Sequence, residues 1–267
     1  MEVIGYISAL FVGLVMGLVG GGGSILSVPI FVYLFGFDPV TATTLSLFVV
    51  GITSFVGAAG FVKQKLIDFQ TAWIFGIPSI LGVLFSRRLI LPNLPEYIIH
   101  RWGMVVSKDL FLLLLFSVLM LVASIKMIRK TERPSGVKQS GNIYTILVSQ
   151  GLLVGIVTGL IGAGGGFLIV PALVMLIGLP MKKAVGTSLF IIGLNSVLGF
   201  LSSIEMVKNE YTFMLVFTAL SVLGIFIGIA VAKKIDGRKL KPAFGWFVLL
   251  MGIFIIIKEI FFKEITV

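Results

Sequence analysis

The sequence contains no cysteine and only one histidine, His100. Disulfide bonds, and metal sites built from thiolates or from several imidazoles, are therefore excluded. A serine hydrolase needs a histidine base, and the single histidine lies in a loop that no sequence signal places beside a serine. Neither glycine cluster of the chain contains the G-x-x-x-x-G-K-[ST] pattern of a nucleotide-binding loop. These absences argue against an enzyme and predict no cofactor and no metal.

Charged residues are also scarce, at 12% against 58% hydrophobic residues, whereas soluble domains carry about 25%. Eight blocks contain no Asp, Glu, Lys or Arg: Val3–Phe37, Ala42–Val62, Phe69–Phe85, Leu110–Ile125, Ile143–Met181, Ala184–Ile204, Tyr211–Ala232 and Pro242–Ile257. Most reach the ~17–25 residues that cross a hydrocarbon layer about 30 Å thick, and they are apolar on all sides. The composition predicts an all-α polytopic membrane protein with about 8 to 10 helical membrane segments and no soluble domain.

The chain contains an internal repeat, in which residues 12–57 align without a gap on residues 154–199 at an offset of 142. Identical residues occupy 21 of the 46 aligned positions. A repeated apolar unit with interrupted helices is typical of transporters that contain an internal pseudo-two-fold axis. We expect a first transmembrane repeat over 1–128, a cytoplasmic linker over 129–142 and a second transmembrane repeat over 143–267. The spacings Gly13-xxx-Gly17 and Gly155-xxx-Gly159 predict helix-contact faces.

The segment that opens each repeat is too long for one crossing, because Val3–Phe37 would measure ~52 Å as a helix. Glycines at 20–23 and 162–166 interrupt the two segments, and each glycine costs ~1 kcal/mol relative to alanine, so we expect breaks there and second arms of ~14 residues. If each segment folds back, the 21 Lys and Arg residues divide 14 to 7 between the two sides; if each crosses once, they divide 10 to 11. The positive-inside bias favours two inverted repeats, each a broken hairpin plus three transmembrane helices, with the linker cytoplasmic and both termini outside.

The two breaks would place the N-termini of two short helices, near Ser24 and Gly166, close to the membrane midplane. Such N-termini present unpaired N–H groups and a positive dipole end contributing ~0.3–2 kcal/mol, and glycine lets a ligand approach the backbone. Hydroxyl and amide donors follow in both copies. The predicted anion-binding residues are Gly20, Gly21, Gly22, Gly23, Ser24, Thr43, Thr44, Gly162, Gly164, Gly165, Gly166, Thr187, Ser188 and Asn195. The alternative interpretation is that the hydroxyls bond their own backbone and the small residues only permit close packing.

The net charge of +10 is confined to the connections, which indicates loops facing an anionic lipid surface rather than a nucleic-acid partner. No ionisable residue lies inside an apolar block, so proton coupling would need a carrier at a block edge, such as Asp38 or Glu205, or the substrate itself. Lys182 and Lys183 at the mouth of the second hairpin fit either an anion-concentrating role or a membrane anchor. A passive anion channel and a purely structural protein remain alternatives to a transporter.

The repeat cores carry a family resemblance. The stretches Gly17-Leu-Val-Gly-Gly-Gly-Gly-Ser and Gly159-Leu-Ile-Gly-Ala-Gly-Gly-Gly-Phe, the Val-Pro that follows each, and Ala184-Val-Gly-Thr-Ser-Leu resemble the sulfite exporter TauE/SafE family over nearly the whole chain. The first copy reads Ala42-Thr-Thr-Leu-Ser-Leu, so Thr187 and Ser188 match the family pattern more closely. The resemblance implies a multi-pass permease of the cell membrane, an exporter of a small anion such as sulfite or an organosulfonate. With the repeats, this leads us to expect secondary transport by alternating access.

Overall fold

The structure of the chain is a computed structural model that describes residues 2–101, 104–128, 143–162, 164–175, 177–207 and 210–261. The elements of the first half are α1 (Glu2–Val19), the 3₁₀ turn η1 (Gly21–Gly23), α2 (Ser24–Tyr33), α3 (Pro39–Lys63), α4 (Phe69–Phe85), the π-helical turn η2 (Ser86–Ile90), α5 (Leu91–Asn93), strands β1 (Tyr97–Arg101) and β2 (Met104–Ser107), and α6 (Lys108–Ile128). Those of the second half are α7 (Ile143–Ile161), α8 (Gly166–Met175), α9 (Met181–Leu201), the 3₁₀ turn η3 (Ile204–Val207), α10 (Tyr211–Lys234) and α11 (Gly237–Phe261). The predicted linker, 129–142, lies outside the described residues.

Within the described part of the chain, seven helices are long and apolar enough to cross a membrane, and three shorter ones are equally apolar: residues 4–19, 24–33 and 166–175. This confirms the predicted all-α polytopic membrane protein. The antiparallel hairpin of β1 and β2 is an addition that the sequence did not predict. The second arms, α2 and α8, have 10 residues each, so the expectation of about 14 was too long. Both arms end before a glycine at φ +76°, Gly36 or Gly178, a conformation that stops a helix.

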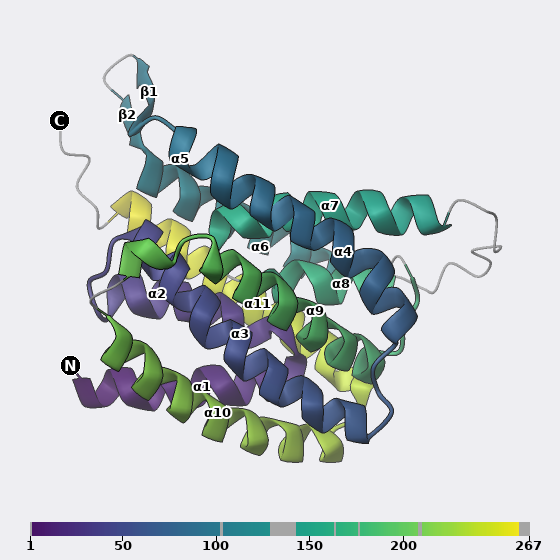
Figure 1. Cartoon of the computed structure of the whole chain (residues 1–267). Helices are drawn as coiled ribbons and strands as arrows, with labels where there is room; N and C mark the ends of the chain where they lie inside the picture. Colours follow the sequence, from purple (N-terminus) through teal and green to yellow (C-terminus); the bar gives the residue numbers. More distant parts are fainter. Residues whose placement is uncertain are drawn as a thin grey trace.

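The strongest packing contacts join one repeat to the other. Helix α1 packs on α10, α4 on α7, α3 on α9 and α6 on α11. At the repeat offset of 142 residues, α1 corresponds to α7 and α4 to α10, so the first two pairs are copies of each other. The two repeats are therefore interleaved rather than packed as separate bundles (Figure 1).

Glycines allow these helices to touch through their backbones. A Cβ atom at Gly13 would overlap the carbonyl oxygen of Ser221 on α10, and a Cβ at Gly155 would overlap that of Ser79 on α4. Both contacts obey the repeat offset, since 13 and 79 correspond to 155 and 221. The interpretation of the two G-x-x-x-G spacings as helix-contact faces is confirmed.

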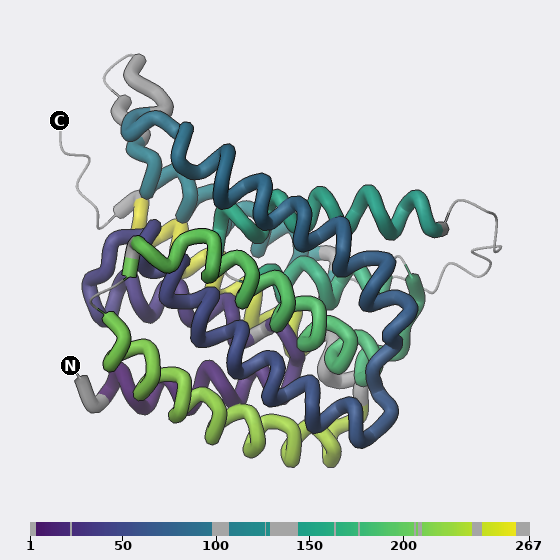
Figure 2. The backbone as a smooth tube through the Cα atoms, viewed as in Figure 1, coloured from purple at the N-terminus to yellow at the C-terminus, as the bar shows by residue number. Residues whose placement is uncertain are grey.

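Equivalent helices of the two repeats run in opposite directions. Helix α9 lies antiparallel to α3, because Gly186 near its start contacts Leu66 after the end of α3, and the ring of Phe200 near its end lies 5.0 Å from that of Phe48. The tube in Figure 2 runs away from the N-terminal end of the bundle along α1, and back toward that end along α7. Both described chain ends lie at this end, while α6 ends and α7 begins at the other.

Candidate anion site at the two glycine breaks

The first break lies between α1 and α2. Gly20 has φ +78°, a left-handed conformation that glycine adopts without strain, and its N–H donates to the carbonyl oxygen of Met16 at 2.8 Å. After η1, helix α2 begins at Ser24, the predicted residue. A Cβ at Gly23 would meet Met16, and the ring of Phe35 after α2 packs edge-on against that of Tyr6 near the start of α1. The segment therefore folds back on itself.

The second break repeats this geometry. Gly162, Gly164 and Gly165 have φ values of +70°, +62° and +75°, and α8 begins at Gly166 as predicted. The N–H of Gly162 donates to the carbonyl oxygen of Thr158 at 2.9 Å. This bond is equivalent to the one between Gly20 and Met16, because Gly162 and Thr158 lie 142 positions after Gly20 and Met16. The left-handed conformations of Gly162, Gly164 and Gly165 explain why glycine occupies these three positions.

The tips of the two breaks touch. A Cβ at Gly21 would overlap the Cα of Gly166, and a Cβ at Gly166 would overlap the Cα of Gly21. Gly21, three residues before α2, is therefore in backbone contact with the first residue of α8, although the two lie more than a hundred residues apart in the sequence. The positive dipole ends of α2 and α8 thus lie near each other in one buried place, which favours an anion beside the contact.

Side chains from the helices after each hairpin face these tips. Gly20 lies against Ser188 and Val185 on α9, since its Cβ would come 2.8 Å from the Ser188 Oγ. Gly162 lies against Thr43 on α3, the repeat equivalent of Val185. The structure thus brings Ser188 and Thr43 to the breaks, each at the break of the opposite repeat. Gly22, which was also predicted as a site residue, lies in η1.

Most predicted hydroxyls hydrogen-bond to backbone carbonyls, as the alternative interpretation states. Ser24 Oγ donates to the carbonyl oxygen of Gly21 at 2.6 Å, Thr43 Oγ1 to that of Val40 at 2.8 Å, and Ser188 Oγ to that of Val185 at 2.9 Å. Such a bond uses the proton and leaves the hydroxyl oxygen able to accept, so binding an anion would require each hydroxyl to turn. The backbone N–H groups of the breaks need no such rotation.

Thr187 and Asn195 lie elsewhere. Thr187 Oγ1 accepts from the backbone N–H of Asp68 at 2.9 Å and so ties α9 to the connection between α3 and α4. Asn195 Nδ2 donates to Ser79 Oγ on α4 at 2.7 Å, while its Oδ1 has no partner in the described chain. Beside it on α9, Ser196 has an unpartnered Oγ that would lie 2.7 Å from a Cβ at Gly164. Ser196 is thus a polar group at the second break that we did not predict as a site residue.

The main residue that the sequence prediction missed is Arg87. It is only 2% exposed, and its Nη2 atom would lie 2.5 Å from a Cβ at Gly162. Its Nη1 atom donates to Thr44 Oγ1 at 3.2 Å, which brings the predicted residue Thr44 to the same place. The apolar block of the sequence ends at Phe85, and this pattern places Arg87 with the loop charges. The repeat offset gave a usable signal, because Arg87 aligns with Ile229 in the middle of an apolar block.

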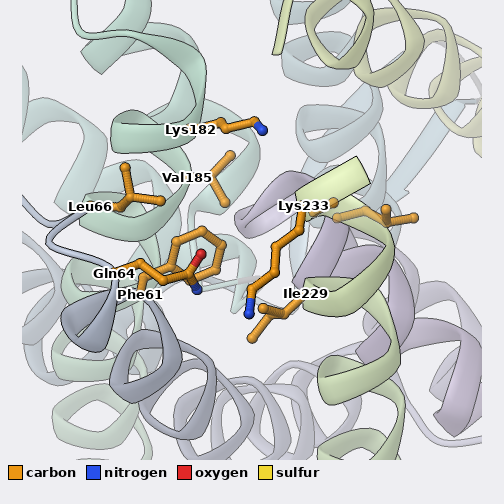
Figure 3. Close-up of a pocket in the computed structure, with 9 residues that line it drawn as sticks. Phe61, Gln64, Leu66, Lys182, Val185, Ile229 and Lys233 are labelled. Carbon is orange, nitrogen blue, oxygen red and sulfur yellow. The ribbon is translucent and has the colours of Figure 1, made fainter. Parts of the chain in front are cut away.

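A pocket of about 190 Å³ lies next to the first break, near the ends of α3 and α10. Its polar lining comes from three helices: Gln64 at the end of α3, Lys182 on α9 and Lys233 on α10, which Figure 3 shows on separate walls. Val185 lines the pocket and also lies against Gly20, whose Cβ would come 3.2 Å from its Cα. The pocket is therefore flanked by cations and lies next to the first break; Lys182, which the sequence analysis placed at the mouth of the second hairpin, lines it.

Comparison with known proteins shows the family of the chain and several relatives. The sequence model of the family described as sulfite exporter TauE/SafE matches residues 6–255. A "Probable membrane transporter protein" of Xylella fastidiosa is 27% identical over 92% of this chain and 91% of its own. A protein of the same description from Bacillus subtilis is 27% identical over 97% and 98%, and one from Methanocaldococcus jannaschii 25% over 96% and 94%. No solved structure matches the chain significantly.

Proposed function

The chain belongs to the sulfite exporter TauE/SafE family and is a membrane transporter, and from that premise we propose that it moves a small anion, sulfite or an organosulfonate, by alternating access. Export is the direction we propose, by analogy with the family description. The competing proposal is a passive anion channel through the same glycine breaks. The cell membrane is the proposed location, with the 129–142 linker cytoplasmic and both termini outside.

One observation supports the anion above all others, the backbone contact of Gly21 with Gly166. It gathers two helix N-termini, whose free N–H groups and dipole ends suit an anion, in the interior of a helical bundle. Irregular backbone of this kind is tolerated at membrane depth where protein or a water-filled cavity satisfies it. The lysine-flanked pocket, whose lining residue Val185 contacts Gly20, is the proposed entry route for the anion.

Support for alternating access comes from the opposite directions of the equivalent helices α3 and α9. At the Gly20 break, Val185 and Ile229 line the pocket and are 2% and 7% exposed. At the Gly162 break, the equivalent residues Thr43 and Arg87 are 3% and 2% exposed, so these side chains are buried at both breaks. If each repeat adopts the conformation that the other has here, the pocket would close at one end of the bundle and open at the other. The conformation described would then be open toward the lysine-rich side, which the positive-inside bias makes cytoplasmic.

Proton coupling remains part of the proposal without an assigned carrier. Asp38 is exposed and accepts a hydrogen bond from the backbone N–H of Thr41 at 3.0 Å, capping the N-terminus of α3. Since a carboxylate in this role is held by a helix end, protonation of the substrate itself is the simpler route for a weak acid such as bisulfite.

Counterflow in proteoliposomes tests the function. Vesicles loaded with unlabelled sulfite should accumulate labelled sulfite transiently against its gradient, and the initial rate should saturate with concentration. A channel would instead equilibrate the label along the electrochemical gradient without overshoot. Protein-free vesicles give the baseline, and sulfoacetate, chloride and the zwitterion taurine complete the panel. If none of the anions accumulates transiently against its gradient, the result contradicts anion exchange.

Neutralising the pocket lysines should weaken anion entry. The double substitution Lys182→Gln and Lys233→Gln is expected to raise the half-saturating anion concentration by about three- to tenfold at low salt, because the pocket loses its local positive potential. The effect should shrink above ~0.1 M salt, where the Debye length falls to about 10 Å. Lys183→Gln is the matched control, since Lys183 is exposed and lies outside the pocket lining. Equal shifts in both variants would remove the pocket as the entry route.

A further inference from the structure

Arg87 is a buried cation with no counter-ion among the described residues. It lies in the π-helical turn η2, between α4 and α5, inside the candidate membrane span 69–93. Its one hydrogen bond in the described chain goes to Thr44, and its Nε and Nη2 atoms have no partner there. An unpaired guanidinium at such a depth is costly to keep, and ionisable groups retained inside membrane spans are usually functional.

The unpartnered atoms face the second glycine break. Nη2 lies beside Gly162, where a Cβ would come within 2.5 Å of it, and Thr43 contacts the same glycine from α3. Four residues beyond Gly162, α8 begins; the N–H of its third residue, Leu168, donates to the carbonyl oxygen of Gly165 at 2.9 Å, and the helix itself supplies no acceptor for the N–H groups of Gly166 and Phe167. The fork of Arg87 and the N-terminus of α8 therefore approach the same break, and both favour negative charge.

The two breaks differ at the position of Arg87. The repeat offset puts Ile229 at the position of Arg87, so the otherwise similar first break has an apolar side chain there. Helix ends and hydroxyls treat all small anions alike to a first approximation, whereas a planar guanidinium pairs two of its N–H groups with two oxygens of one ligand. A halide, being a single sphere, cannot make that paired contact.

We propose that Arg87 binds the substrate directly and selects an oxyanion with two adjacent oxygens, such as a sulfite, sulfonate or carboxylate group, over a halide. The inference rests on the proposed anion transport and deepens it by assigning the charge partner and the ligand class. In the conformation described, the guanidinium is buried beside Gly162, which Thr43 also contacts. The opposite conformation, in which this end opens, would expose it to incoming or departing anion.

The test compares Arg87→Met, Arg87→Lys and the control Arg88→Met in purified protein, with thermal unfolding followed during titration with sulfite, sulfoacetate and chloride. Arg88 is the adjacent, exposed arginine, so its replacement removes the same charge without touching the break. Wild type and Arg88→Met should be stabilised by the oxyanions at similar concentrations. Arg87→Met should need more than about tenfold higher oxyanion concentration for the same shift. Its ligand-free melting temperature should equal or exceed that of wild type, because an unpaired buried charge has been removed.

Arg87→Lys keeps the charge and loses the fork, so it should lose most of the preference for oxyanion over chloride. If Arg87→Met cannot be purified, the oxyanion preference of Arg87→Lys alone tests whether Arg87 binds the anion. Wild-type affinity in Arg87→Met, or wild-type oxyanion preference in Arg87→Lys, would overturn the role of Arg87 and leave anion transport standing. No stabilisation of the wild-type protein by any of the anions would count against the proposed function itself, and the inference would fall with it.

Discussion

Gly21→Ala is expected to abolish anion transport. A methyl group at position 21 would overlap the Cα of Gly166, and both contacting atoms belong to backbone, so no side chain can rotate away. The two breaks must move apart, which costs about 1–3 kcal/mol of overpacking and separates the two helix N-termini. Gly21 has no left-handed φ, so the substitution tests this contact and not backbone strain. Flux per inserted protein and the melting temperature in detergent measure the outcome, and Gly166→Ala should behave in the same way.

Gly76→Ala is the matched control. Gly76 is buried in α4, and a Cβ there meets only the side chain of Ile191 at 3.8–4.0 Å, which is ordinary contact. This variant should transport at the wild-type rate and gain up to about 1 kcal/mol of stability from helix propensity. Wild-type transport by Gly21→Ala would show that the breaks need not touch for function, and the account of the site would fail.

Gly155→Val is expected to prevent assembly of the fold. The α4–α7 interface has no room for even one methyl group, because a Cβ at Gly155 would overlap the carbonyl oxygen of Ser79. The larger side chain must push α7 away from α4 along the whole contact, and it loses the close backbone approach that holds membrane helices together. We expect monodisperse protein to fall more than about tenfold in yield, or its unfolding transition to disappear. Size-exclusion chromatography and thermal unfolding provide the measurement.

The control for this prediction is Leu153→Val on the same helix. Leu153 is 55% exposed, so valine there introduces the same β-branched side chain on a face that touches no other described helix closely. It should cost only the propensity difference, below about 0.7 kcal/mol. A normal yield of Gly155→Val with a transition near that of wild type would contradict the backbone contact between α4 and α7. Gly13→Val tests the equivalent α1–α10 contact independently.

The helix breaks could be predicted from the sequence because they depend on local chemistry. Four consecutive glycines at 20–23 cannot sustain a helix, and the short helices begin at Ser24 and Gly166 as expected. Length and composition were enough for the membrane spans, since each depends on its own residues alone. The close-packed faces at Gly13 and Gly155 also followed from spacing, because small residues four apart lie on one side of a helix.

What the sequence could not supply was pairing across the two repeats. Nothing near Gly21 indicates that its neighbour is Gly166, and nothing near Ser79 indicates that Gly155 packs on it; both contacts depend on how the repeats interleave. Arg87 was missed for a related reason. Its charge ended an apolar block in the sequence, but the π-helical turn after α4 carries the chain on inside the bundle and buries the guanidinium. Only the alignment of Arg87 with Ile229 marked the position in advance.

The account centres on one claim, that main-chain N–H groups of two touching glycine breaks hold the transported anion. Crystals soaked in selenite, the heavier analogue of sulfite, test this directly through the anomalous scattering of selenium. The account predicts a selenium peak within hydrogen-bond distance of the backbone at 20–24 or 162–166, with Arg87 or Ser188 beside it. Bound selenite at a distant place, or a map in which Gly21 and Gly166 stand well apart while the anion is bound, would contradict it.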